Sequence, residues 1–133
     1  MLVDSSVWID HYIGQNTPEV GNLRIALASG LPVFVTDIIL VEVLQGFRSE
    51  KDFALASGQM LHFPRLSLDD RGYLAAAKLS RQLRSKGVNL GSVIDVLIAQ
   101  IAITHVQPLL TTDTDFKFIA LHSELRLAER ESA

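Results

Sequence analysis

Four acidic side chains occupy positions from which they could act together, although they lie far apart in the sequence. Asp4 follows a short apolar run at the start of the chain, and Asp113 follows another near its end. Both runs have the pattern of buried parallel strands, whose carboxyl ends meet at one edge of a sheet. Glu42 and Asp95 fall early in helical patterns that begin at that same edge. We therefore expect the four carboxylates to converge on one cleft.

Glu42 is the hardest of these acids to explain as an ordinary surface residue. Its neighbours at 38–41 and 43–44 are all apolar, and no Lys or Arg lies within one helical turn. An ionised carboxylate that is buried without a partner costs several kcal/mol. Glu42 therefore either faces solvent from a single polar stripe of its helix or meets a cation, and a metal ion is the natural candidate.

Four carboxylates in one crevice, or five with Asp115, need a counter-charge, because mutual repulsion would otherwise protonate or separate them. Mg²⁺ and Mn²⁺ prefer carboxylate oxygen and water as ligands. Such an ion keeps water ligands that a phosphate oxygen can replace, which suits phosphodiester hydrolysis. Zinc is not expected, because the chain has no cysteine and its histidines show no ligand spacing; these are His11, His62, His105 and His122.

Each acid also has a purely structural explanation. Asp4 could cap a helix, and Asp95 could pair with Ser92 in a capping box. Asp113 and Asp115 are of the residue type that is common in turns. Taken singly, these explanations account for the residues at least as well as catalysis does, so the chemical interpretation depends on convergence.

The elements that must position the acids are short strands alternating with helices. Apolar runs predict strands over 1–3, 32–35 and 108–111, and a last edge strand over 125–127. The first run stops at Asp4, which favours a central strand buried on both faces. This alternation predicts an α/β fold with a small, mainly parallel sheet flanked by helices.

Seven helices are expected from periodicity and capping signals. Ser5 or Ser6, Thr17, Thr36, Ser49, Ser67 and Ser92 are the expected capping residues. In the fifth helix one face carries Tyr73, Ala76, Leu79 and Leu83, while the sixth is apolar almost all round and should be buried. The final residues should fray. The predicted helices cover about 5–13, 18–29, 38–45, 50–61, 68–85, 93–103 and 116–121.

The composition sets limits on the class of protein. A chain of 133 residues, 48% of them apolar, fits a single domain over 1–133 with a real core. No apolar stretch approaches the roughly 20 residues that span a bilayer, and the start lacks a signal-peptide pattern, so we expect a cytoplasmic protein. The net charge of −3 argues against a protein that coats nucleic acid. It does not exclude an enzyme that holds a phosphate backbone through metal ions.

Four segments resemble, in order, the motifs of PIN-domain proteins of the VapC toxin type. They are LVDSSVWID at 2–10, the helix at 38–46 that contains Glu42, SVIDVLIA at 92–99, and LTTDTDF at 110–116. Any one of these motifs is weak evidence, but four in order over nearly the whole chain are specific.

The resemblance implies a PIN-like α/β/α sandwich and a Mg²⁺- or Mn²⁺-dependent endoribonuclease, the toxin half of a bacterial toxin–antitoxin pair. Asp4 and Asp95 would be the principal metal ligands, and Glu42 and Asp113 would complete the acidic cluster. Asp115 would help directly or through water. The resemblance also implies that Ser5 or Ser6 positions a metal ligand or the phosphate, and that the protein is a homodimer bound by a small VapB-like antitoxin.

The sequence departs from this family pattern at one place. Relatives often carry a basic residue just before the Ser of the third motif, whereas residues 88–91 here are uncharged. Phosphate contacts could come instead from the basic residues of the fifth helix and its end, although a solvated helix face is the simpler explanation for most of them. These residues are Arg71, Lys78, Arg81, Arg84 and Lys86.

Three other functions remain open from the sequence. A receiver-type signalling domain also places acids at strand ends, but it would need adjacent acids after the first strand and a Lys ending the last one, and neither is present here. A PIN-fold RNA-processing nuclease without an antitoxin would use the same acids. A catalytically silent PIN-fold binding module would act only through a partner.

Overall fold

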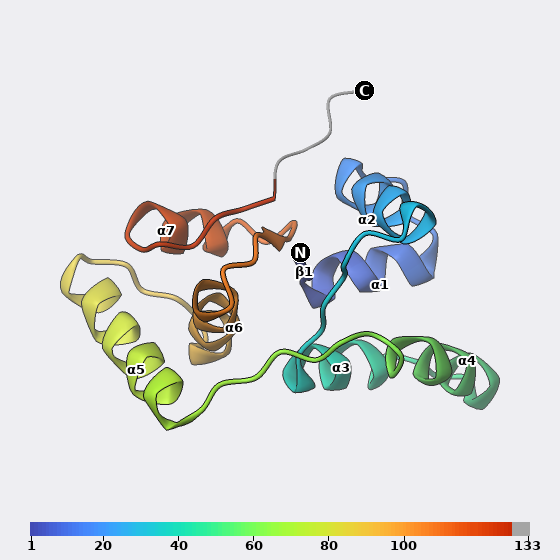
Figure 1. The fold of residues 1–133 in the computed structure, drawn as a ribbon, viewed down its shortest axis with the longest axis horizontal. Helices are drawn as coiled ribbons and strands as arrows, with labels where there is room; N and C mark the ends of the chain where they lie inside the picture. The colour runs from blue at the N-terminus through green and yellow to red at the C-terminus, as the bar shows by residue number, and fades with distance from the viewer. Residues whose placement is uncertain (129–133) are drawn as a thin grey trace.

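The computed structural model describes residues 1–128 and is mostly helical around a very small parallel sheet. Figure 1 shows the N-terminus in the middle of the molecule, with α1 and α2 on one side of β1 and α5, α6 and α7 on the other. The α/β class predicted from the sequence is confirmed. The elements are β1 (Leu2–Val3), α1 (Ser5–Ile13), α2 (Pro18–Ser29), α3 (Asp37–Leu44), α4 (Glu50–Met60), α5 (Asp70–Ser85), α6 (Val93–Thr104), β2 (Leu109–Leu110) and α7 (Asp115–Leu121).

The first strand is central, as its apolar pattern predicts. β1 pairs in parallel with β2, Leu2 opposite Leu109, and a single parallel bridge joins Leu2 to Phe34 on the other side. Within the described chain, two further single parallel bridges extend the sheet. One joins Arg65 to Val35, and the other joins Leu127 to Leu109. The predicted strands at 32–35 and 125–127 are therefore present only as isolated bridges. The bridge at residue 65 was not predicted, because the segment around Pro64 has no alternating pattern.

Most helix starts follow the capping residues expected from the sequence. The side-chain oxygens of Thr17, Thr36, Ser49 and Ser92 each accept a hydrogen bond from a backbone N–H in the first turn of the following helix. These bonds satisfy donors that a helix start leaves unpaired. Local sequence chemistry thus decides where α2, α3, α4 and α6 begin.

Two of the predicted helix starts are wrong in detail. The fifth helix begins at Asp70 and is capped by Asp69, whose carboxylate accepts from the Gly72 N–H, rather than by Ser67. Asp and Ser are both strong capping residues, so the residue that directly precedes the first helical turn, Asp69, makes the capping bond. The first helix includes Ser5 and Ser6, and the capping position belongs to Asp4, whose side chain makes no capping bond.

The predicted burial of the sixth helix is confirmed, whereas the predicted face of the fifth is partly wrong. α6 buries six residues and packs between α5 and α7. In α5, Ala76, Leu79 and Leu83 are buried, but Tyr73 is 55% exposed and Gly72 takes the buried position instead. None of the helices in residues 1–128 is long and apolar enough to cross a membrane. The fraying predicted for the final residues concerns positions 129–133, outside the described part of the chain.

Candidate metal centre

The structure gathers the predicted acids around the carboxyl ends of β1 and β2. Asp4 follows β1, Glu42 lies in α3, and Asp95 lies in the first turn of α6. Asp113 lies in the loop after β2, and Asp115 is the first residue of α7. One carboxylate oxygen from each of Asp95, Asp113 and Asp115 can be chosen so that all three lie within 4.8 Å of one another.

Asp4 is held in place by two hydroxyl groups. The carboxylate is almost completely buried, and its Oδ2 accepts hydrogen bonds of 2.9 Å from both Ser6 Oγ and Thr111 Oγ1. Although Asp4 occupies the capping position of α1, its side chain makes no capping hydrogen bond to that helix. The structural alternative for Asp4 therefore does not explain how its side chain is used.

The same hydroxyls tie the start of α1 to the loop after β2. The Thr112 N–H donates to Ser6 Oγ at 3.3 Å, and the Asp113 N–H donates to Thr111 Oγ1 at 3.0 Å. Asp113 Oδ1 in turn accepts from the Asp115 N–H at 2.9 Å. Asp113 thus has the turn role expected of an Asp, and this same bond sets its carboxylate beside the start of α7.

Asp95 is the carboxylate that is most strongly affected by its surroundings. Burial of this half-buried group, followed by the negative charges of Asp113, Asp4, Asp115 and Glu42, raises its pKa from 3.8 to about 6. Each of these causes disfavours the ionised form. Asp4, Glu42, Asp113 and Asp115 therefore all lie within electrostatic reach of Asp95.

Glu42 points into the same region rather than toward solvent. Its Oε1 is buried and has no hydrogen-bond partner among the described residues. Burial, and then the charge of Asp4, raises the pKa of Glu42, while a hydrogen bond with Ser5 acts in the opposite direction. A buried acceptor without a donor is costly, and a bound cation would remove that cost.

The raised pKa of Asp95 leads to a prediction for the metal-free protein. Between pH 3.8 and about 6 the folded state binds more protons at this group than the unfolded state does, so rising pH removes stability. We expect the melting temperature of wild type relative to Asp95→Asn, measured in EDTA, to fall as pH rises from 4 to 7. If the difference in melting temperature between wild type and Asp95→Asn does not change with pH, the pKa of Asp95 is not raised.

Sequence reasoning missed Thr111, which it interpreted only as the end of a strand. Its hydroxyl, 107 positions after Asp4 in the sequence, joins the Asp4 carboxylate to the Asp113 backbone. The only local signal is the position of a hydroxyl residue at the carboxyl end of a strand, two residues before an acid. That pattern is too common in turns to identify a ligand-positioning residue.

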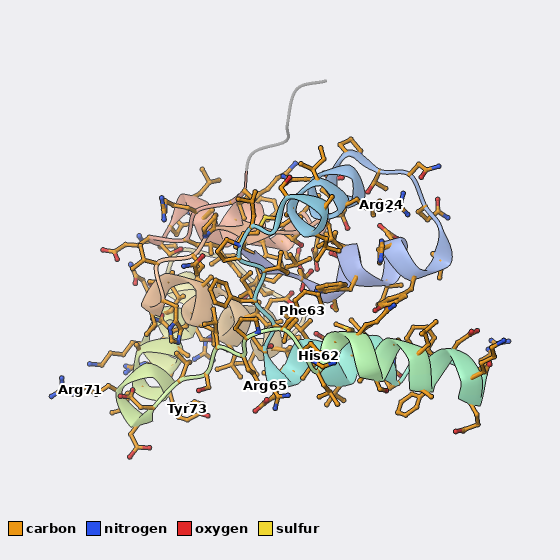
Figure 2. The ribbon with its side chains drawn as sticks, turned by 45° about the vertical axis from the view of Figure 1, so that its right-hand side comes forward. Arg24, His62, Phe63, Arg65, Arg71 and Tyr73 are labelled. Carbon is orange, nitrogen blue, oxygen red and sulfur yellow. The ribbon has the colours of Figure 1, made fainter. Side chains whose placement is uncertain are left out.

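Basic and aromatic side chains that could contact a nucleic acid come from several different elements of the chain (Figure 2). Arg71 and Tyr73 project from the first turn of α5, whereas Arg24 lies on α2. Arg65 lies 3.1 Å from Asp37, in the one ion pair found among residues 1–128. The basic residues that the sequence analysis noted on and after α5 are all exposed. No Lys or Arg in the described chain therefore forms an ion pair with the acidic cluster.

Known proteins are similar in sequence to this chain over nearly its full length. It is 27% identical over 130 residues to VapC ribonuclease Mb1587 of Mycobacterium bovis and to ribonuclease VapC11 of Mycobacterium tuberculosis. Each alignment covers 96% of this chain and 97% of the relative. The relatives therefore have nearly the same extent as this chain.

Solved structures show that the fold is shared as well. The chain superimposes on a chain of VapBC2 from Rickettsia felis bound to a DNA fragment from its promoter, with a TM-score of 0.76, 19% identity and 96% of both chains covered. FitAcB from Neisseria gonorrhoeae gives a TM-score of 0.71 at 16% identity, with 99% of both chains covered. A family model described as PIN domain matches residues 1–121. With this match over most of the chain, and with the motifs, fold and acid positions described above, the protein belongs to the PIN-domain family rather than to the receiver-type alternative.

Proposed function

We propose that this protein is a Mg²⁺- or Mn²⁺-dependent endoribonuclease, with residues 1–133 forming one PIN-like domain. The observation that carries the proposal is the convergence of five carboxylates that no Lys or Arg of the described chain neutralises. The curated relatives are named as ribonucleases, which supports RNA as the substrate. The reaction is hydrolysis of a phosphodiester bond.

The residues present fit a hard divalent cation. Asp95, Asp113 and Asp115 offer oxygens within 4.8 Å of one another, and Glu42 Oε1 is buried without a hydrogen-bond partner in the described structure. Oxygen-only ligand sets of this kind select Mg²⁺ or Mn²⁺ over zinc. When bound, the ion would supply Lewis-acid stabilisation of the phosphate and a more acidic water. We assign Asp4 and Asp95 as principal ligands and Glu42 and Asp113 as the remainder of the cluster.

The other polar residues hold these carboxylates in position. Ser6 and Thr111 both bind Asp4 Oδ2, which orients the carboxylate and leaves Oδ1 for a ligand. A hydrogen bond with Ser5 offsets part of the rise in the pKa of Glu42 that burial and Asp4 cause. Asp115 begins α7 beside Asp113 and would contact the metal directly or through water. Such supporting bonds fix ligand geometry before the metal arrives.

The similar solved structures support a proposal about the biological setting. VapBC2 from Rickettsia felis and VapBC from Salmonella typhimurium were both solved as DNA-bound complexes. The chain would be the toxin of a bacterial toxin–antitoxin module, a homodimer in the cytoplasm restrained by a VapB-like antitoxin. Co-purification with the product of a short adjacent reading frame tests the partner. Its absence would favour the RNA-processing nuclease that works without an antitoxin.

The nuclease itself is tested with antitoxin-free protein and a defined structured RNA. Cleavage should require Mg²⁺ or Mn²⁺ and should stop in EDTA and in Asp4→Ala. Metal binding is measured in parallel by calorimetry. If no RNA is cut and no metal binds, the catalytically silent PIN-fold module is the better explanation.

Thr111→Val should reduce cleavage without unfolding the protein. The substitution keeps the shape of the side chain but removes the hydroxyl that donates to Asp4 and accepts from the Asp113 N–H. Loss of such a supporting contact typically costs about 10- to 100-fold in metal affinity or activity. Steady-state kinetics across a Mg²⁺ titration measures the loss. Thr111→Ser, which keeps the hydroxyl, is the matched control and should retain most activity.

A further inference from the structure

A cavity of about 440 Å³ opens directly beside the acidic cluster. The loop after β2 forms one side of it through Thr111, Thr112 and Asp113, while Lys117 of α7 lies on another. Thr111 binds Asp4, and Asp113 belongs to the cluster, so the cavity is continuous with the proposed metal site. Its volume falls within the range of about 300–1,000 Å³ that small ligands occupy.

The lining of the cavity combines an apolar wall with one basic side chain, Lys117, and two acidic ones, Asp113 and the buried Glu19. Leu109, Leu127 and Ala128, at the outer edge of the sheet, form the apolar part of the lining. Lys117 is exposed and is the one basic side chain in the described lining; it makes no ion pair with any described acid. An apolar surface beside an ammonium group that no ion pair of the described chain occupies suits a ligand that carries both a flat base and a phosphate.

A larger cavity exists elsewhere but lacks this connection. The groove among α5, α6 and α7 measures about 660 Å³ and is lined by Lys78 and Lys86, yet no residue of the acidic cluster lines it. A substrate bound there would not be placed against the carboxylates by the lining itself. The cavity beside Asp113 is therefore the one that can position a substrate for the proposed reaction.

We infer that this cavity is a nucleotide subsite, which holds the RNA nucleotide next to the scissile bond. The base packs against Leu127 and Ala128, and Lys117 binds the neighbouring phosphate. The inference rests on the proposed nuclease function. One divalent ion offsets only part of the negative charge of five carboxylates, so the next phosphate still approaches an acidic region and needs a separate cation. Lys117, four residues after Asp113, supplies that charge.

The test compares Lys117→Gln with wild type on two substrates. One is an RNA oligonucleotide, and the other is bis(p-nitrophenyl) phosphate, a phosphodiester that carries no nucleotide. For RNA, the KM should rise about tenfold, the size of one charge-assisted hydrogen bond, with kcat nearly unchanged. Hydrolysis of the small diester should change less than about twofold. In Lys117→Gln the slope of log KM against the logarithm of the salt concentration should decrease by about 0.7, which corresponds to the loss of one phosphate contact on a single strand.

Three further variants make the result specific. Lys51→Gln removes the same charge from an exposed position on α4 and should leave the RNA KM at the wild-type value. Lys117→Arg keeps the charge and should restore most of the affinity. Ala128→Phe fills the apolar wall and should raise the RNA KM while hydrolysis of the small diester continues.

The outcomes separate the inference from the function on which it rests. Wild type that hydrolyses neither substrate with any metal refutes the nuclease, and the subsite with it. Metal-dependent cleavage of RNA with an unchanged KM in Lys117→Gln refutes the subsite alone. A parallel loss on both substrates in Lys117→Gln also overturns it, because it would place Lys117 in the support of the carboxylates.

Discussion

Asp95→Asn should abolish RNA cleavage and at the same time stabilise the metal-free protein. Burial, together with the charges of four other carboxylates, raises the pKa of Asp95 to about 6. At pH 7 a neutral amide removes that repulsion, so the melting temperature in EDTA should rise. The same amide is a poor ligand for Mg²⁺, so activity should fall about a thousandfold or more. A substitution that raises the melting temperature and lowers the activity is expected only if the charge of Asp95 serves function at the expense of stability.

The control for this prediction is Asp70→Asn, which makes the same chemical change at the exposed start of α5. It should leave cleavage intact and alter the melting temperature only slightly. Circular dichroism melts and a gel-based cleavage assay suffice for both variants. If purified Asp95→Asn cleaves RNA at the wild-type rate, the assignment of the metal centre is wrong.

Removal of the metal should have an equally large effect. Protein treated with EDTA should not cut RNA, and either Mg²⁺ or Mn²⁺ should restore cleavage in full, because both fit the oxygen ligands that the cluster offers. The ion should also stabilise the fold, since it offsets part of the repulsion within the cluster and satisfies Glu42. At a metal concentration of 100 times Kd the gain is about 2.7 kcal/mol, a rise in melting temperature of roughly 5–10 °C.

The dependence of this stabilisation on pH distinguishes a site from nonspecific ion binding. Protons and metal compete for Asp95, so the metal-induced rise in melting temperature should shrink as pH falls below about 6. Asp95→Asn should show little rise at any pH. Cleavage that persists in EDTA, or an equal metal-induced rise in wild type and Asp95→Asn, would contradict a metal site at these carboxylates.

The sequence alone determined the features that depend on neighbouring residues. The starts of α2, α3, α4 and α6 follow from Thr17, Thr36, Ser49 and Ser92, because a cap needs only a side-chain oxygen within reach of the next turn. The central position of β1 follows from its apolar run. The placement of the acids near one another follows from a general property of parallel sheets, whose strands end at a common edge.

Only the tertiary structure decided how these residues are used. The bond between Thr111 and Asp4 joins positions 107 residues apart, and no local pattern specifies such a pair. The raised pKa of Asp95 depends on distances to acids from three other segments of the chain. The bridge at residue 65 and the exposure of Tyr73 likewise depend on what packs nearby. Local signals act over a few residues, whereas electrostatic and packing forces act between segments that only folding brings together.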